Sequence, residues 1–160
     1  MKEKSIELLN TALRDELAAV HQYMYFHFHL DDLGYNPLAN MLKMTAIDEM
    51  RHAEMLAERI LFLGGEVTMD VARPVETIHD AEEMLEMAKR LEHDSIEMYN
   101  KFALECAQNL DSASKKLFED LVAAEEGHWD AFDRQADFVK RFGERYLALQ
   151  SFDGGGGEQA

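Results

Sequence analysis

The sequence predicts an all-α protein: a four-helix bundle with one long crossover and a short fifth helix near the C-terminal end. Apolar residues recur at three- and four-residue steps through four long segments. Glycine, aspartate and Asn-Pro signals separate these segments, and β-branched runs typical of strands are missing. Of the 160 residues, 47% are hydrophobic and 30% are charged, which is the balance of one globular domain.

The first predicted helix covers residues 4–33 and ends at Gly34. The second is predicted to begin with Asn36 as its N-cap and Pro37 in its first turn. It stops at Gly64-Gly65, since glycine readily takes the left-handed conformation that ends a helix. These two helices form the first predicted hairpin.

The segment 66–79 has no helical period and is longer than a tight turn requires. It is long enough to run along the bundle, which would place the second and third helices parallel. The third helix is predicted over residues 81–108 with Asp80 as its cap. The fourth follows Asp111 in the same way and extends to about residue 141.

A short amphipathic segment, residues 144–152, follows Gly143. Residues 1–152 are therefore the predicted domain. Residues 153–160 contain four consecutive glycines and are predicted to form a flexible tail.

The formal net charge of −16 argues against direct binding to nucleic acid or to an anionic membrane surface. A single cysteine, Cys106, excludes a disulfide framework and fits a reducing compartment. No apolar run reaches the length of a signal peptide core or a membrane span. A cytoplasmic location is the expectation.

The chemistry lies in a doubled Glu-x-x-His motif, once at Glu49–His52 and once at Glu125–His128. Residues three apart project from the same side of a helix. Glu16 precedes the first motif by 33 residues, and Glu92 precedes the second by the same interval. The two halves are thus offset by 76 residues throughout, which indicates an internal repeat with pseudo-two-fold symmetry.

Each of these acidic residues lies on an apolar helix face, where an uncompensated carboxylate is costly. Two divalent ions would neutralise four carboxylates. In this interpretation Glu49 and Glu125 bridge the ions, Glu16 and Glu92 are terminal ligands, and each ion has one histidine ligand. The six predicted ligands are Glu16, Glu49, His52, Glu92, Glu125 and His128. Fe, Mn and Zn all suit such ligands.

Tyr23 and Tyr99 are also 76 residues apart, each seven positions after a ligand glutamate. Two interpretations remain open for them. They either donate hydrogen bonds to the ligating carboxylates or are amphipathic core tyrosines.

The stretches DELAAVHQY, IDEMRHAE with ERILFLGG, and AAEEGHWD resemble the bacterioferritins, a di-iron family with the ferritin-like four-helix bundle. The resemblance covers residues 5–152 and carries over all six ligands. It implies a ferroxidase that oxidises Fe(II) with oxygen or hydrogen peroxide at a di-iron site. It also implies a hollow homo-oligomer of 24 subunits that stores ferric mineral, with a ferredoxin-type electron donor as partner.

The resemblance further implies that Met50 is an axial ligand of haem, b-type or a related porphyrin, at a two-fold subunit interface. Helical geometry agrees, because Met50 points away from the side that carries Glu49 and His52. An interface methionine without haem is the alternative. Leu17, His21 and Met24 share an adjoining outer face and are candidates to line the pocket.

The chain departs from some bacterioferritins at Met44. Those proteins have a histidine there, which forms an inner-surface iron site with the residue that matches Asp48. Methionine is a poor ligand for such iron, so this site is in doubt here. His21, His27 and His29 are additional histidines, for which surface or core positions are expected.

Two other classes of function compete with iron storage. One is a non-storing di-iron enzyme, such as a rubrerythrin-like peroxidase, or a smaller Dps-like shell. Rubrerythrins usually add a Cys-rich module, which one cysteine does not allow, and a manganese catalase is normally longer. The other class is a metal-free helical interaction protein, against which the doubled spacing and the acidic residues on apolar faces argue.

Overall fold

The computed structural model describes residues 2–152, without the side chain of residue 152. Five helices account for the regular structure of this range: α1 (Lys2–Asp32), α2 (Asn36–Phe62), α3 (Ala81–Gln108), α4 (Ser112–Phe142) and α5 (Glu144–Phe152). The predicted tail, residues 153–160, lies outside the described residues.

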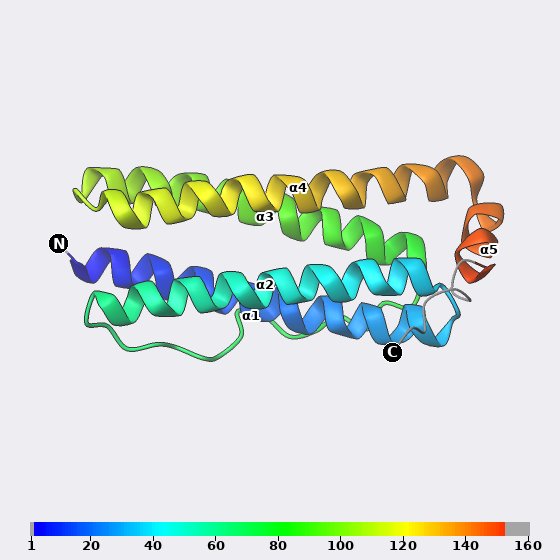
Figure 1. The fold of residues 1–160 in the computed structure, drawn as a ribbon, viewed down its shortest axis with the longest axis horizontal. Helices are drawn as coiled ribbons and strands as arrows, with labels where there is room; N and C mark the ends of the chain where they lie inside the picture. The colour runs from blue at the N-terminus through cyan, green and yellow to red at the C-terminus, as the bar shows by residue number, and fades with distance from the viewer. Residues whose placement is uncertain (1, 153–160) are drawn as a thin grey trace, which may run out of the picture.

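Two helical hairpins build the bundle (Figure 1). α1 packs along α2, and α3 packs along α4. The segment 66–79 runs back along α1, so that α2 and α3 run in the same direction, as the sequence predicts. α5 turns across the end of the bundle, where it contacts α4 and α2.

Side-chain amides hold the crossover segment 66–79 against α1. Asn10 donates to the carbonyl of Glu66 (2.9 Å) and accepts from the amide of Thr68 (2.8 Å). Gln22 makes the same two-way pair with the backbone of Glu76, at 3.0 and 2.8 Å. These two amides satisfy backbone groups that a strand partner would otherwise satisfy, so the segment needs no secondary structure of its own.

The apolar core is divided into two clusters, one toward each end of the bundle. One cluster includes Tyr23, Phe26 and Phe132. The other includes Leu9 and Phe118. On each long helix the predicted metal ligands lie between the residues of the two clusters, so the polar centre is placed at the middle of the bundle.

Two of the three predicted helix caps form. Asp80 accepts from the amide of Glu83 at 3.0 Å, and Asp111 accepts from the amide of Ser114 at 3.2 Å. The third prediction was wrong: Asn36 is not the N-cap of α2, because the preceding residue, Tyr35, occupies that position and Asn36 is already helical.

The turn before α2 explains the shift of its cap. Gly34 adopts φ +84° and its amide donates to the carbonyl of Asp31 at 2.9 Å. The amide of Tyr35 donates back to Leu30 at 3.0 Å, so the chain leaves α1 and enters α2 with only three residues between the two helices. None of the described helices is long and apolar enough to cross a membrane.

Besides the polar centre at the middle of the bundle there is another polar group, made of Asp111, Arg59 and Ser114. It is called the Asp111 cluster here. The Arg59 guanidinium donates to the Asp111 carboxylate at 2.7 Å and to the Ser114 hydroxyl at 2.9 Å. This cluster connects α2 to the start of α4.

Candidate metal centre

The four predicted glutamate ligands meet inside the bundle, one from each long helix. Glu16 comes from α1, Glu49 from α2, Glu92 from α3 and Glu125 from α4, and all four are buried. Each is one of the few charged residues on an otherwise apolar face. Helical periodicity therefore directs them to the same place, and the pairing of the two hairpins brings them together.

The two histidines divide this cluster into two overlapping sets of ligand atoms. One set is Glu16, Glu49, His52 and Glu125, and the other is Glu49, Glu92, Glu125 and His128. In each set the ligand atoms lie within 4.8 Å of one another. Glu49 and Glu125 belong to both sets, which is the arrangement required of carboxylates that bridge two ions.

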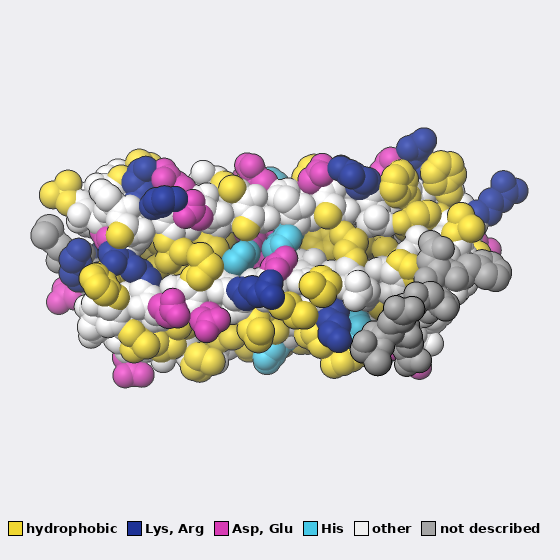
Figure 2. Space-filling view, viewed as in Figure 1, with side chains coloured by type: hydrophobic (Ala, Val, Ile, Leu, Met, Phe, Trp, Pro, Cys, Tyr) yellow, Lys and Arg dark blue, Asp and Glu magenta, His cyan; other side chains and the backbone are white. Residues whose placement is uncertain are grey.

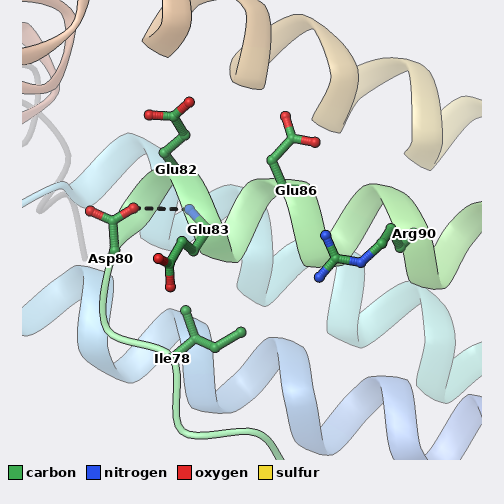
Figure 3. Close-up of a pocket in the computed structure, with 6 residues that line it drawn as sticks. All are labelled: Ile78, Asp80, Glu82, Glu83, Glu86 and Arg90. Atoms are coloured by element: carbon green, nitrogen blue, oxygen red, sulfur yellow. Dashed lines mark hydrogen bonds between the residues drawn. The ribbon is translucent and has the colours of Figure 1, made fainter.

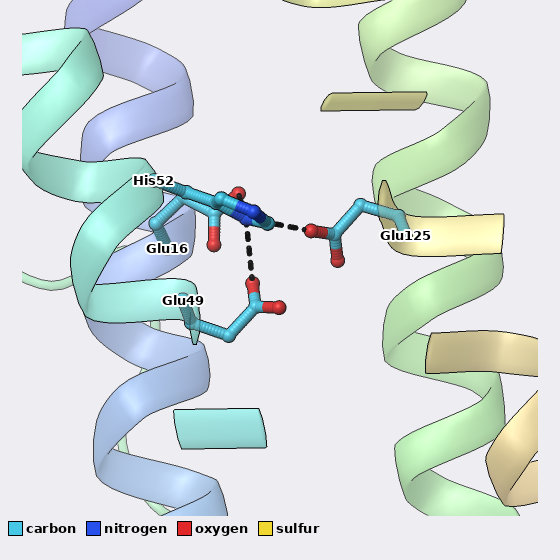
Figure 4. A group of neighbouring side chains, drawn as sticks. All are labelled: Glu16, Glu49, His52 and Glu125. Atoms are coloured by element: carbon cyan, nitrogen blue, oxygen red, sulfur yellow. Dashed lines mark ion pairs between the residues drawn. The ribbon is translucent and has the colours of Figure 1, made fainter. Parts of the chain in front are cut away.

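Each histidine reaches across the bundle to the other hairpin. The Nδ1 atom of His52 on α2 lies 2.9 Å from a carboxylate oxygen of Glu125 on α4. Figure 4 marks this ion pair with a dashed line. The Nδ1 atom of His128 on α4 lies 2.7 Å from a carboxylate oxygen of Glu49 on α2. The pseudo-two-fold symmetry read from the 76-residue offset is therefore present in the structure.

Polar atoms of the centre lack hydrogen-bond partners within the protein. The Nδ1 atoms of both histidines are buried and make no hydrogen bond of acceptable geometry, although carboxylate oxygens lie nearby. Each of the four glutamates also has at least one buried carboxylate oxygen without a hydrogen-bond partner. Buried polar atoms are normally paired, so a group of convergent unpaired donors of this kind fits metal ions.

The electrostatics of the protein without metal point the same way. Burial, reinforced by the neighbouring carboxylates, raises the pKa of Glu49 well above its ordinary value, and burial does the same for Glu92. Burial opposes the charged form of His52, but the carboxylates of Glu125 and Glu16, 2.9 and 3.5 Å from its Nδ1 atom, outweigh it and raise the pKa of His52 to about 10. The centre thus demands positive charge, from protons or from cations.

Tyr23 and Tyr99 play both roles that the sequence left open. Both are fully buried in the core. The Tyr23 hydroxyl donates to Glu92 at 2.7 Å, and the Tyr99 hydroxyl donates to Glu16 at 2.5 Å. Each tyrosine therefore holds a carboxylate of the other hairpin, again in the pseudo-symmetric pattern.

The centre reaches the surface through its histidines. The side chains of His52 and His128 are 11% and 15% exposed, whereas the four carboxylates are almost fully covered. Figure 2 shows histidine side chains at the surface near the middle of the molecule.

Sequence reasoning did not find one contact at this centre. The Nε2 atom of His128 lies 3.2 Å from a carboxylate oxygen of Asp48. From the sequence, Asp48 is a candidate only for an inner-surface iron site with residue 44. Its contact with His128 joins α2 to α4, so no local sequence pattern reports it.

The remaining candidate residues lie apart from the carboxylates. Met50 is 54% exposed and Met44 is 47% exposed, both on α2. His21 is exposed, while Leu17 and Met24 are half-buried. The structure thus leaves Met50 with a thioether available at the outside of the subunit, as helical geometry predicted.

An acidic pocket of about 410 Å³ at the start of α3 is separate from the centre (Figure 3). Its hydrogen bond between the Glu83 amide and Asp80 is the helix cap already described. Figure 3 shows that the carboxylates of Glu82 and Glu83 point apart. Glu86 is paired with Lys140 at 2.9 Å. These side chains form a solvated surface and do not converge on an ion.

Comparison with known proteins agrees with this geometry. The family model for the ferritin-like domain matches residues 6–142. Bacterioferritin from Desulfovibrio desulfuricans is 41% identical over 147 residues, which cover 92% of this chain and 82% of that protein. Bacterioferritin from Rhodobacter capsulatus is 38% identical over 147 residues, which cover 91% of this chain and 91% of that protein.

Two crystal structures share the fold. The D. desulfuricans bacterioferritin, described with its diiron site in different catalytic states, superimposes with a TM-score of 0.92 at 40% identity over 94% of this chain and 88% of that one. The R. capsulatus bacterioferritin is described with a metal-free dinuclear site and haem iron in a crystallographic special position. It superimposes with a TM-score of 0.89 at 36% identity over 93% of both chains. The chain therefore belongs to the bacterioferritins, within the ferritin-like family.

Proposed function

We propose that this protein is an iron-storing ferroxidase, which oxidises Fe(II) at the buried centre and forms a shell of 24 subunits around the ferric product. The observation that carries this proposal is the pair of overlapping ligand sets that share Glu49 and Glu125. Two divalent cations there would balance four carboxylates. Iron suits mixed carboxylate and imidazole ligands, and when bound it supplies the electrons that reduce dioxygen or hydrogen peroxide.

In this proposal the roles of the six residues follow from the shared ligand sets. Glu49 and Glu125, which belong to both sets, would be shared by the two ions. Glu16 and His52 would complete one position, and Glu92 and His128 would complete the other. Because each position draws on both hairpins, the centre depends on the assembled bundle.

The surrounding residues prepare the carboxylates for this task. Hydrogen bonds from Tyr23 and Tyr99 hold Glu92 and Glu16 in fixed orientations. The two apolar clusters on either side exclude bulk water, which strengthens the attraction between buried carboxylates and cations. The exposed edges of the two histidines leave a short path for ions between the centre and the surface.

Haem binding is proposed at Met50. A haem between two subunits takes one methionine from each, and a two-fold interface brings an exposed residue of α2 against its own copy. The exposure of the Met50 thioether and the haem iron described for the R. capsulatus relative support this assignment. A ferredoxin-type donor is the proposed source of electrons for iron release, and the cytoplasm, where a buried Cys106 stays reduced, is the proposed location.

The experiment that tests storage adds excess Fe(II) in air to metal-free protein and follows iron through size-exclusion chromatography. We expect iron far above two ions per chain to elute with a very large particle. Rapid oxidation that stops near two ions per chain on a small oligomer would instead identify a non-storing di-iron enzyme.

A matched pair of variants tests the centre itself. Glu125→Gln removes a proposed bridge, and we expect it to slow Fe(II) oxidation by about 100-fold or more. Glu126→Gln changes the next residue, which is exposed, and serves as the control. Equal oxidation rates in the two variants would contradict the ligand assignment.

A second pair tests haem binding. Met50→Leu should abolish the Soret absorption of protein reconstituted with haem, while Met44→Leu, which alters another exposed methionine of α2, should leave it unchanged. Persistence of the Soret band in Met50→Leu would place the axial ligand elsewhere.

A further inference from the structure

The two histidines of the centre differ in what they contact on their outer side. The Nε2 atom of His128 lies 3.2 Å from a carboxylate oxygen of Asp48. A carboxylate only accepts hydrogen bonds, so Nε2 carries the hydrogen and donates it. With an ion in the centre, the other ring nitrogen, Nδ1, would provide the lone pair, and it is the one that faces Glu49, Glu92 and Glu125.

The internal repeat does not supply this contact to His52. The position 76 residues after Asp48 is Ala124, which has no carboxylate. Within residues 2–152, His52 has acidic neighbours only at Nδ1, and its Nε2 atom has no protein hydrogen-bond partner. The asymmetry therefore follows from a sequence difference at one pair of equivalent positions, Asp48 and Ala124.

Asp48 is itself held in place. Its second carboxylate oxygen lies 3.3 Å from the guanidinium of Arg51, one turn further along α2. The residue equivalent to Arg51 in the other half is Gly127. Both members of this outer pair are thus present beside His128 and absent beside His52.

We infer that Asp48 is a positioning residue for His128 and that it makes the two metal positions unequal, the position at His128 holding its ion more tightly. This inference rests on the two-ion centre proposed above. A carboxylate behind a ligating imidazole fixes the ring orientation and the tautomer and strengthens the ring as a donor. Loss of such a partner typically lowers metal affinity by roughly 10–100-fold.

The inequality assigns different tasks to the two positions. An ion at the His128 position would have an imidazole ligand held by Asp48, whereas an ion at the His52 position would have an imidazole oriented only by the centre itself. We therefore expect the His52 position to exchange its ion more readily.

The first test titrates metal-free protein with Co²⁺ and follows the ligand-field absorption, which reports coordination without any turnover. We expect two ions per chain in two steps whose dissociation constants differ by roughly 10–100-fold. Asp48→Ala should weaken the tighter step until the two steps merge. Asp48→Asn, whose amide oxygen still accepts from Nε2, should give an intermediate affinity.

A control separates the hydrogen bond from simple loss of negative charge. Glu126→Ala removes an exposed carboxylate beside Glu125. It should leave the separation of the two steps unchanged. The converse variant, Ala124→Asp, places a carboxylate at the equivalent position of the other half and should tighten the weaker step.

A double-mutant cycle assigns the steps to positions. In a His52→Ala protein, which retains the His128 position, adding Asp48→Ala should lower Co²⁺ affinity by roughly 10–100-fold. In a His128→Ala protein the same addition should have no effect. Equal losses of Co²⁺ affinity in the two backgrounds would overturn the inference. It would also be overturned if the two binding steps of the wild-type protein stayed equally far apart after Asp48→Ala.

The outcomes also separate this inference from the proposed function. Wild-type protein that fails to bind two Co²⁺ ions per chain would overturn both the two-ion centre and the inequality. Two ions bound with equal affinity, unaffected by Asp48→Ala, would overturn the inequality alone and leave the ferroxidase proposal standing.

Discussion

Two clusters of buried charge lie in the same bundle, and they are neutralised differently. In the Asp111 cluster one carboxylate meets one guanidinium at 2.7 Å and accepts one further hydrogen bond from the Ser114 amide, while its Oδ2 atom has no hydrogen-bond partner. In the metal centre four carboxylates face two imidazoles, and polar atoms of all six side chains remain without hydrogen-bond partners.

This difference teaches how to tell a structural charge from a functional one. The Asp111 cluster balances its charge within the chain, one carboxylate against one guanidinium, and it connects α2 to α4. The metal centre has more negative charge than the chain can balance. Excess buried charge of one sign is costly to folding and is therefore a sign of a ligand of the opposite sign.

The largest expected effect comes from supplying that ligand. Zn²⁺, which has no redox chemistry, should stabilise the metal-free protein by about 4 kcal/mol for each bound ion at free concentrations roughly a thousandfold above its dissociation constant. The measurement is denaturant unfolding with and without Zn²⁺. No change in the free energy of unfolding would mean that the charge of the centre, like that of the Asp111 cluster, is already balanced within the chain.

The second effect comes from making the Asp111 cluster resemble the metal centre. Arg59→Met leaves Asp111 buried without its cation, and we expect a loss of about 3–5 kcal/mol in the free energy of unfolding. Arg134→Met is the control, since Arg134 forms an exposed pair with Asp130 and should change stability by less than about 1 kcal/mol. Similar losses in both variants would show that burial of the Asp111 cluster contributes little.

A third effect is the response of the Asp111 cluster to pH. Burial favours the neutral form of Asp111, but polar groups of Ser5, Ser114 and Arg59 outweigh it and hold the pKa of Asp111 below its ordinary value of 3.8. A lowered folded-state pKa stabilises the protein fully above the unfolded-state pKa, and this contribution is lost as the pH falls toward the folded-state value.

Asp111→Asn measures this contribution. It should cost about 1.5–3 kcal/mol in the free energy of unfolding near neutral pH, because the hydrogen bonds lose their charged acceptor. The difference from wild type should shrink steadily as the pH falls below 3.8. A difference that is constant from neutral to acidic pH would assign the effect to packing.

The smallest effect has the opposite sign. Glu49→Gln lowers the negative charge of the metal centre, and in the presence of a chelator we expect the free energy of unfolding to rise by about 0.5–2 kcal/mol while Zn²⁺ binding is lost. Glu54→Gln, an exposed change five residues further along α2, should alter neither. A destabilised Glu49→Gln protein would show that Glu49 is compensated within the chain and that the contrast between the clusters fails.

Much of the fold could be predicted from local patterns. Helical periodicity located all five helices, and Asp80, Asp111, Gly34 and Gly64 marked their ends because caps and left-handed turns depend on residues within a few positions. The start of α2 was misplaced by one residue, since the turn through Tyr35 is set by hydrogen bonds from α1 and not by the side chain of Asn36.

The candidate ligands also followed from the sequence, because a 76-residue repeat placed acids and histidines on apolar faces that must pack inward. What only the tertiary structure decided is which of them meet. The contact of His52 with Glu125, that of His128 with Asp48 and the pairing of Arg59 with Asp111 each join residues more than 50 positions apart. Such distances depend on how two hairpins pack, whereas periodicity and caps depend only on neighbours along one helix.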